Sequence, residues 1–206
     1  MRSRGTRFLR VARRLAEALG PDECLLVGGL AVMVHGFVRA TRDVDLVTRL
    51  ALSEARSRLE KAGLPTKLLK GDAFEGAFSC LKGECERLPF DVLSQLVPIH
   101  WEAAESVGAL GSGLRAVALR DLLALKFKAQ GAKDLMDTAM LVMLHPASEP
   151  HARELATAYR VLDRFEHWLS DPRLRAQARE EARLEEQAAG RSLVRKRPGP
   201  QPRRRR

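Results

Sequence analysis

Two aspartates separated by a single residue, Asp43 and Asp45, are the side chains in this sequence most suited to chemistry. They lie in the segment DVDLV, whose alternation of polar and apolar residues predicts a β-strand. Residues two apart on a strand point to the same face, so both carboxylates project to one side. Carboxylates placed in this way repel each other unless a cation lies between them, and their oxygens suit Mg²⁺ or Mn²⁺. The pair indicates either a divalent-metal site or, alone, a solvated strand edge.

A pair of glycines, Gly28 and Gly29, precedes the aspartates by about 15 residues. The glycines follow an apolar run at residues 24–27, which predicts a buried strand, and they lead into a short helix predicted over residues 30–36. Glycine lets the backbone approach a ligand closely, and a helix N-terminus offers unpaired N–H groups and a positive dipole end. Alone, a Gly-Gly pair is usually a tight turn. Together with the aspartates it predicts a phosphate site beside a metal site, which phosphoryl transfer requires.

The stretch that holds both pairs, residues 28–45, reads GGLAVMVHGFVRATRDVD. It resembles the signature GGxAxxxHGxxRxTxDxD of the nucleotidyltransferase superfamily, which has the DNA polymerase β-like fold, and every fixed position is present. The resemblance is to the small bacterial branch that includes the AbiEii-type toxins. A second segment, DLLALK at residues 121–126 followed by Ala129 and KDLMD at residues 133–137, resembles a helix pair of the same branch. The two similarities cover about residues 22–145.

The resemblance implies a third carboxylate on a neighbouring central strand. Asp91, in the segment LPFDVL, matches this position best, so Asp43, Asp45 and Asp91 are the expected catalytic and metal-binding residues. A third carboxylate can hold a second metal or take the proton of the attacking hydroxyl. The alternative for Asp91 is a capping or turn residue. Glu84 and Glu86 lie in polar, turn-rich segments and fit the role less well, as does Asp72.

The resemblance also implies the residues that contact the nucleotide: Gly28, Gly29, Arg39, Thr41 and Lys126. In the branch, the lysine that matches Lys126 points into the cleft and contacts phosphates, a role that suits its compact charge. The alternative is a lysine that extends along an apolar surface to solvent at the domain edge.

Three further polar residues near these segments have structural explanations. His35 is interpreted as a hydrogen-bonding residue that orients the loop carrying Arg39 and Thr41. Asp134 is interpreted as a helix N-cap, and Asp137 as a carboxylate of the first helical turn.

The remaining pattern predicts an α/β (α+β) fold, with a small mixed β-sheet flanked by helices and followed by C-terminal helices. Residues 1–118 form the α/β core with its N-terminal helix, residues 119–189 a helical part that completes the cleft, and residues 190–206 a disordered basic tail. The predicted helices span residues 6–19, 30–36, 52–62, 119–130, 134–144, 150–169 and 172–189. The predicted strands span residues 24–27, 43–47, 66–70, 74–82, 88–93 and 114–118.

The net charge of +10 in this chain of 206 residues belongs mostly to the tail. Residues 191–206 hold eight Arg or Lys residues and no acid, which leaves 28 basic against 26 acidic residues elsewhere. The tail is expected either to contact nucleic acid through its charge or to act as a solubilising end.

The sequence also indicates the compartment. No apolar run is long enough to span a membrane, no secretory signal is expected, and three cysteines without a CxxC spacing support neither a disulfide framework nor a zinc site. A cytoplasmic location is expected.

These observations favour a Mg²⁺-dependent nucleotidyltransferase that transfers a nucleoside monophosphate from a nucleoside triphosphate, such as ATP, to an acceptor hydroxyl. The resemblance suggests RNA (tRNA ends for the toxins), a protein side chain or a small molecule such as an aminoglycoside as acceptor, and a cognate antitoxin or other protein as partner. Two other classes stay open. The chain could be a catalytically inactive nucleotide- or RNA-binding module with a regulatory, antitoxin-like role, or an interaction protein whose helices at residues 150–189 dock a partner.

Overall fold

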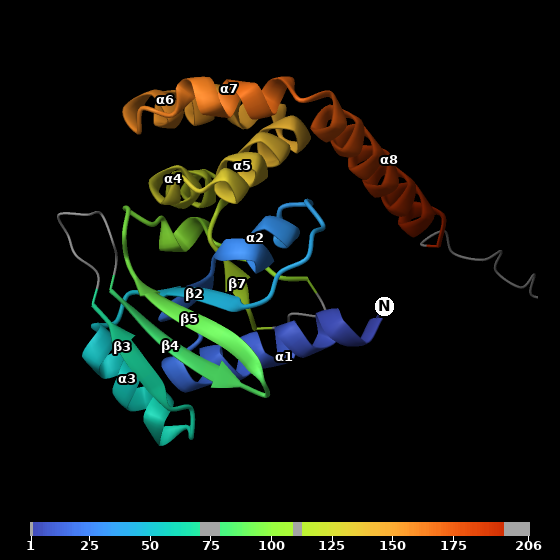
Figure 1. The fold of residues 1–206 in the computed structure, drawn as a ribbon. Helices are drawn as coiled ribbons and strands as arrows, with labels where there is room; N and C mark the ends of the chain where they lie inside the picture. Colours follow the sequence, from blue (N-terminus) through green and yellow to red (C-terminus); the bar gives the residue numbers. More distant parts are fainter. Residues whose placement is uncertain (1, 71–78, 109–112, 196–206) are drawn as a thin grey trace, which may run out of the picture.

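The computed structural model describes residues 2–70, 79–108 and 113–195. The chain folds into one mixed β-sheet with helices on both faces, and further helices stack beyond one of these faces (Figure 1). The helices are α1 (Arg2–Leu19), α2 (Gly28–Val34), α3 (Leu52–Lys61), α4 (Leu119–Ala129), α5 (Ala132–Leu144), α6 (Glu149–Ala158), α7 (Leu162–Ser170) and α8 (Pro172–Arg195), with short 3-10 helices at Trp101–Ala103 and Pro146–Ser148. The strands are β1 (Cys24–Leu26), β2 (Val44–Thr48), β3 (Thr66–Leu69), β4 (Cys80–Cys85), β5 (Leu88–Ser94), β6 (Glu105–Ser106) and β7 (Arg115–Ala116).

The sheet has the strand order β3-β4-β5-β2-β1-β7-β6. Strand β2 pairs in parallel with β5, and β1 pairs in parallel with β7, whereas the other neighbours are antiparallel. The predicted mixed α/β fold is therefore confirmed. The parallel β2–β5 pair sets two strands with acidic residues side by side near the middle of the sheet.

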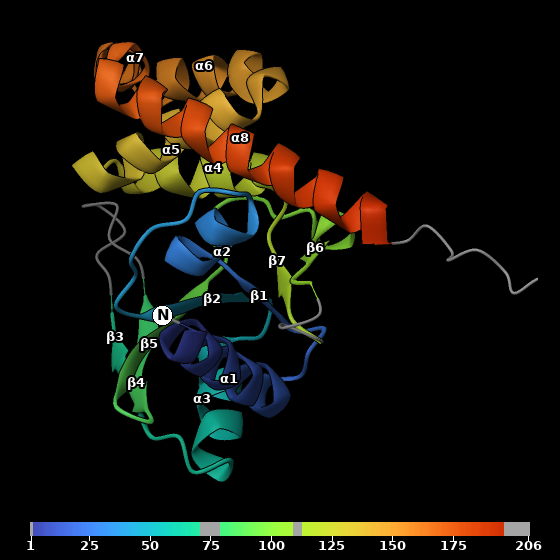
Figure 2. The same ribbon diagram turned by 90° about the vertical axis from the view of Figure 1, so that its right-hand side faces the viewer.

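The helices form distinct layers. Helices α1 and α3 lie against one face of the sheet, and α2 lies on the other face, where α4 and α5 pack above it (Figures 1 and 2). Helices α6 and α7 cover α4 and α5, and α8 projects from this upper layer (Figures 1 and 2). The helical layer and the sheet therefore face each other across α2.

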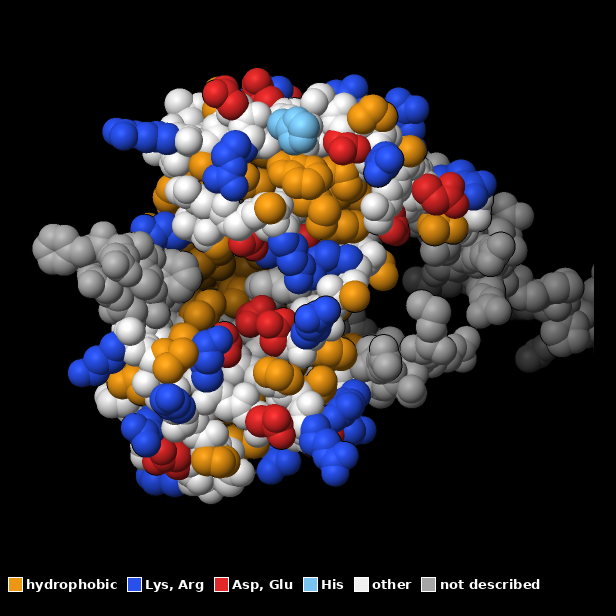
Figure 3. Space-filling view, viewed as in Figure 1, with side chains coloured by type: hydrophobic (Ala, Val, Ile, Leu, Met, Phe, Trp, Pro, Cys, Tyr) orange, Lys and Arg blue, Asp and Glu red, His pale blue; other side chains and the backbone are white. Residues whose placement is uncertain are grey.

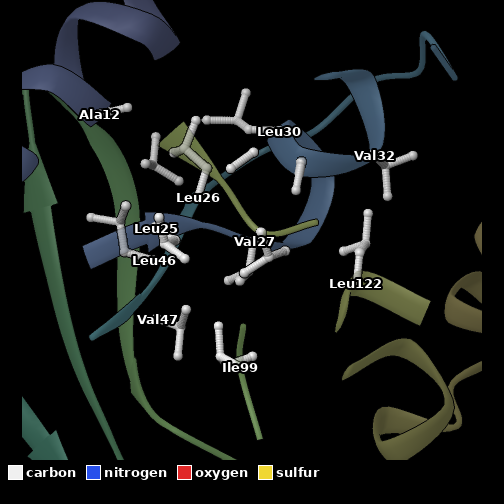
Figure 4. Packing of buried hydrophobic residues seen from close by; sticks show 14 of the residues in the cluster. Ala12, Leu25, Leu26, Val27, Leu30, Val32, Leu46, Val47, Ile99 and Leu122 are labelled. Atoms are coloured by element: carbon white, nitrogen blue, oxygen red, sulfur yellow. The ribbon is translucent and has the colours of Figure 1, made fainter. Parts of the chain in front are cut away.

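One continuous hydrophobic core joins the two parts of the chain. Leu25 and Leu46 on the central strands pack with Ala12 of α1, and Val27 lies between the sheet and Leu122 of α4 (Figure 4). All of these side chains are at most 2% exposed. The helical part is thus packed onto the sheet as part of the same core, which fixes the position of α4 relative to the acidic strands.

The hairpin between β4 and β5 departs from the predicted strands. A strand was expected over residues 74–82, but β4 spans Cys80–Cys85 and residues 71–78 lie outside the described part of the chain. Gly83 lies inside β4 with the ring of Phe90 against it; a Cβ there would lie 2.3 Å from Phe90 Cζ. A glycine at this position makes room for an aromatic ring of the neighbouring strand.

The C-terminal helices also differ from the prediction. The single helix expected over residues 150–169 is two helices, α6 and α7, and the chain turns between them at Arg160, which has a left-handed φ of 57°. No glycine or proline marks this break. Helix α8 continues to Arg195, past the expected start of the disordered tail at residue 190, and residues 196–206 lie outside the described residues. No helix in the described residues has the length and apolar character needed to cross a membrane.

Candidate functional site

The predicted acidic residues lie on the two parallel central strands. Asp45 of β2 and Asp91 of β5 are direct partners in the register, and Asp43 immediately precedes β2. Partners directly across a sheet project to the same face. The β2–β5 pairing therefore brings Asp91, which is remote in sequence, to the face of the sheet on which Asp45 lies, next to Asp43.

The two glycines of the sequence signature lie directly against this acidic group. Gly28 has a left-handed φ of 58°, and a Cβ on it would lie 1.9 Å from Asp45 Oδ2. The backbone N–H of Gly29 donates a hydrogen bond to Asp45, and a Cβ on Gly29 would lie 2.5 Å from Thr41 Oγ1. Both positions require glycine because side chains of the acidic segment occupy the space that a side chain would need. The turn from β1 into α2 is thus packed onto the carboxylates.

Burial and like charge act together on Asp45. Burial raises the pKa of the Asp45 carboxyl to about 6, and repulsion from Asp43 and Asp91 adds to the rise, while the charge of Lys126 and the Gly29 N–H oppose it. A buried carboxylate with two acidic neighbours is a group that a bound cation would stabilise. This electrostatic situation is what the sequence pattern had indicated for a metal site.

A pocket of about 250 Å³ opens beside Asp45, between the sheet and α4. The space-filling view shows a hollow between the sheet and the helical layer, with hydrophobic side chains at its back and charged side chains beside it (Figure 3). The apolar lining comes from β5, the residues that follow it, α4 and Val27, and the glycines and several charged side chains complete the lining. The lining residues are Val27, Gly28, Gly29, Arg39, Asp45, Asp91, Leu93, Leu96, Leu122, Leu125, Lys126, Ala129, Lys133 and Asp134. Such a mixture of an apolar wall and a few polar groups is typical of a small-molecule site.

Thr41 and Asp43 lie outside the pocket lining and contact each other. The Thr41 hydroxyl donates a hydrogen bond to Asp43 Oδ1 at 3.0 Å. Of the residues expected to bind nucleotide, Thr41 is thus placed as a support for the acidic segment, whereas Gly28, Gly29, Arg39 and Lys126 line the pocket.

Two of the three cationic side chains that line the pocket, Arg39 and Lys126, share a buried carboxylate. Arg39 donates from Nε and Nη2 to the two oxygens of Asp137, at 2.6 Å each, and Lys126 Nζ lies 2.8 Å from Asp137 Oδ2. Lys126 Nζ also donates to Asp134 Oδ1 at 2.7 Å. The Asp137 side chain has no exposed surface, and that of Lys126 is 8% exposed. Lys126 is therefore buried in an ion-pair network at the pocket wall.

This network corrects the interpretation of the two aspartates on α5. Gly131 occupies the N-cap position of α5, so Asp134 is not the cap; it lies in the first turn and binds Lys126. Asp137 lies beyond the first turn of α5, so the prediction of a first-turn carboxylate is wrong; it is instead the buried counter-ion of both Arg39 and Lys126. The sequence carried a signal for this role: Asp137 lies between Met136 and the apolar run that begins at Ala139, and a buried acid there needs a partner.

Lys82 is a neighbour of the site that the sequence did not indicate. It lies on β4 as the register partner of Asp91, and its Nζ donates to Asp91 Oδ2 at 2.6 Å. This hydrogen bond is the main reason why the pKa of Lys82 is raised above its usual value. Only the pairing of β4 with β5 reveals the contact, and that hairpin was misplaced in the sequence prediction.

His35 is a buried hydrogen-bonding residue, as expected, but its hydrogen bonds go to β7 and to the end of α5 rather than to the loop that carries Arg39 and Thr41. Its ring is buried, its Nε2 lies 2.9 Å from the Val117 carbonyl oxygen, and its own carbonyl accepts a hydrogen bond from His145 Nε2 at 2.8 Å. These bonds tie the end of α2 to β7 and to the end of α5. Glu86, a weaker candidate for the third acid, points to α1 instead and pairs with Arg10.

The donor chemistry of the site fits a hard divalent cation that is held partly by the substrate. Within the described residues, no three His, Cys, Asp or Glu side chains converge closely enough to enclose a metal ion. Asp43 and Asp45 nevertheless supply oxygen ligands on one strand face, and Mg²⁺ is commonly held by one or two carboxylates together with substrate phosphates. These two carboxylates would supply only part of the ligand set of such a cation, and a phosphate group would have to supply the rest.

No protein-family model and no curated protein matches the chain. Several solved structures resemble it, among them the following three. A candidate nucleotidyltransferase from Thermotoga maritima is 14% identical over 60% of this chain and 84% of its own, with a TM-score of 0.47. JHP933 from Helicobacter pylori is 13% identical over 91% of this chain and 98% of its own, with a TM-score of 0.38. A candidate nucleotidyltransferase from H. pylori is 12% identical over 87% and 96%, with a TM-score of 0.43. The function is therefore inferred from the geometry of the site.

Proposed function

We propose that the protein is a nucleotidyltransferase that uses Mg²⁺ or Mn²⁺ to transfer a nucleoside monophosphate from a nucleoside triphosphate to an acceptor hydroxyl. The observation that carries this proposal is the contact between Gly28 and the Asp45 carboxylate at the edge of the pocket. It places the start of α2 and the acidic residues within one site. Phosphoryl transfer needs this combination of a place for phosphates and a place for their cation.

Different side chains of the site would carry out different parts of this transfer. Asp43 and Asp45 would hold the cation together with the phosphates, and the cation would neutralise the charge that develops on them. Gly28 and Gly29 let the triphosphate approach the start of α2, and Lys126 and Arg39 add positive charge on the pocket wall. Asp91 faces the same side from β5, where its carboxylate would take the proton of the acceptor hydroxyl or hold a second cation.

The apolar wall of the pocket suits the base of the nucleotide. Leu93 and Leu96 lie at the end of β5, and Leu125 and Ala129 lie on α4 opposite them. A base placed between them would bury its flat faces against apolar side chains while its phosphates lie toward Gly28 and Lys126. This orientation accounts for the separation of apolar and charged groups in the pocket.

RNA is the acceptor that the chain's charge favours, because the basic residues at 191–206 attract polyphosphates without regard to sequence. A toxin-like role, with tRNA as acceptor and a cognate antitoxin as partner, follows from this choice and from the sequence resemblance. A protein side chain or a small molecule such as an aminoglycoside is the alternative acceptor. The same experiment separates these acceptors.

The test is to incubate the full chain with each α-phosphate-labelled nucleoside triphosphate, Mg²⁺ or Mn²⁺, and either total RNA, protein extract or aminoglycosides. We expect label in one acceptor class and release of pyrophosphate. The variant in which both Asp43 and Asp45 are changed to Asn should bind nucleotide weakly and transfer no label. Nucleotide binding without transfer to any acceptor would instead identify an inactive binding module.

A further inference from the structure

The site continues across the sheet as a row of charged side chains on four adjacent strands. Asp45 of β2 pairs with Asp91 of β5, Asp91 pairs with Lys82 of β4, and Lys82 pairs with Lys67 of β3. Direct register partners project to the same face of a sheet. The row therefore runs acid, acid, lysine, lysine along one face, and it begins beside Gly28, which touches Asp45.

Only one of the two lysines reaches an acid of the row. Lys82 Nζ lies 2.6 Å from Asp91 Oδ2, and the Lys82 side chain is 50% exposed while that of Asp91 is 23% exposed. Lys67, one strand further out, is exposed. The ammonium group of Lys82 is thus the direct neighbour of Asp91 on the side of β5 away from β2.

The position of Lys82 bears on how the three carboxylates are arranged. Asp45 approaches Asp91 from β2, and their negative charges repel each other, whereas Lys82 attracts Asp91 from β4. Both forces act in the same direction, toward β4. This agrees with the finding that, in the described part of the chain, no three acidic or other ligating side chains converge to enclose a cation.

We propose that Lys82 is a resident counter-ion of the site, which holds the Asp91 carboxylate toward β4 and must release it before Asp91 can bind a divalent cation. The inference rests on the proposed function, because it concerns the cation that the acidic residues would hold. Lys82 and the metal compete for the same carboxylate oxygen. Lys82 is therefore a positioning residue, since it acts on the site through Asp91.

Competition of this kind has a direct consequence for metal affinity. Removal of the ammonium group frees Asp91 and adds one uncompensated negative charge next to Asp45, and both changes favour a divalent cation. Because the Lys82 side chain is half exposed, its ion pair with Asp91 competes only weakly with a bound cation. We expect Lys82→Met to tighten Mn²⁺ binding by about fivefold or less, which is the ratio that corresponds to a partly exposed ion pair.

The experiment is a titration of Mn²⁺ into the nucleotide-free full chain, followed by electron paramagnetic resonance of the free ion. It compares the wild-type protein with Lys82→Met, Asp91→Asn and the double variant. Lys82→Met should bind Mn²⁺ more tightly and Asp91→Asn more weakly, and in the Asp91→Asn background Lys82→Met should have no larger effect than Lys67→Met. The last result shows that Lys82 acts through Asp91.

Lys67→Met is the matched control, because it removes the same charge one strand further along the row. An equal gain in affinity from Lys67→Met would mean that only the overall charge matters, and it would overturn the inference. Unchanged or weaker Mn²⁺ binding by Lys82→Met would also overturn it, while the proposed function would stand as long as the wild-type protein binds Mn²⁺ through Asp43 and Asp45. Absence of Mn²⁺ binding by the wild-type protein would remove the metal from the proposed function and this inference with it. Thermal unfolding in metal-free buffer verifies that each variant is folded.

Discussion

Arg39 and Asp137 form a two-bond ion pair across 98 residues of sequence, with both nitrogen–oxygen distances at 2.6 Å. Arg39 lies in the loop between α2 and β2, and Asp137 lies in the middle of α5, so the pair connects the acidic segment to the helical layer. Asp137 is buried, and Lys126 shares it. One carboxylate therefore sets the positions of two cations that line the pocket.

Asp137→Asn should destabilise the protein strongly. The change leaves Arg39 without its charged partner in a buried position, and breaking a buried pair in this way typically costs about 3–5 kcal/mol. Denaturant unfolding followed by circular dichroism measures the loss. Asp134→Asn is the control, because the Asp134 side chain is 26% exposed and Lys126 still has its ion pair with Asp137 in this variant. The free energy of unfolding of Asp134→Asn should fall by no more than about 1 kcal/mol. Equal effects of the two changes would contradict the assignment of Asp137 as the central residue.

Gly28→Ala should disrupt the acidic group as well as strain the backbone. A methyl group there would lie 1.9 Å from Asp45 Oδ2, so Asp45 has to move. Gly63→Ala is matched to it, because Gly63 has a φ of 72° and nothing within 4 Å of a new Cβ. The left-handed backbone alone costs about 1–2 kcal/mol in either variant.

We therefore expect both variants to lose stability, but only Gly28→Ala to lose binding of Mn²⁺ and nucleotide. Calorimetric titration measures the binding. Retention of full affinity by Gly28→Ala would show that the contact with Asp45 is not part of the site.

The stability of the metal-free protein should depend on pH through Asp45. Its pKa is about 6 in the folded protein against 3.8 for an ordinary aspartate carboxyl, so the folded state holds the proton more tightly than the unfolded state between these values. Stability attributable to Asp45 is therefore lost as the pH rises from about 4 to above 6.

Asp45→Asn should accordingly raise the free energy of unfolding at pH 7.5, by up to about 3 kcal/mol, and should leave it nearly unchanged at pH 4. Thermal and denaturant unfolding at both pH values test this. A loss of stability at pH 7.5 would mean that Asp45 supports the fold through its charge. Added Mg²⁺ should stabilise the wild-type protein at pH 7.5 and leave the variant less affected.

Deletion of residues 196–206 should weaken RNA binding if RNA is the acceptor. The deleted segment holds Lys196, Arg197 and the four arginines at 203–206, and it leaves α8 intact. The slope of log affinity against log salt should fall by about 0.7 for each phosphate contact that is lost. Nucleotide binding in the pocket should not change. An unaltered RNA affinity and salt slope would leave the tail as a solubilising segment and would favour a small-molecule or protein acceptor.

The part of the site that lies within residues 24–48 could be predicted because its signals are local. A buried strand, two glycines and a strand with alternating aspartates follow one another closely, and each element is stabilised largely by its own pattern. The structure places β1, α2 and β2 at these positions. The contact of Gly28 with Asp45 is the physical reason for the glycine in this segment.

The β4–β5 hairpin could not be predicted from local signals. Its turn residues, Glu86 and Arg87, both have left-handed backbones, with φ values of 52° and 60°. Such turns usually contain Asn or Gly, and neither is present here. Tertiary contacts hold the turn instead: Arg10 and Arg7 of α1 bind Glu86.

The roles of Lys82 and Asp137 in the site could not be predicted from local signals either. Each is placed by a partner that is remote in sequence or lies across a hairpin whose register had to be known first. The periodicity of a sequence predicts on which face of a helix or strand a residue lies. It does not predict which residue of another element that side chain contacts. Ion pairs between elements thus become visible only when the elements have been assembled.

The order in which the strands leave the ribosome differs from their order in the sheet. Strand β1 is synthesised early, but Leu26 pairs with Ala116 of β7, which is made only after most of the sheet. Until then β1 has an open edge beside a strongly apolar segment, and unpaired edges of this kind can pair with other chains. The pairing of Leu26 with Ala116 also closes a long stretch of chain, which slows folding. We therefore expect nascent chains to be most prone to aggregation shortly before residue 116 emerges, and the complete chain to refold slowly for its size.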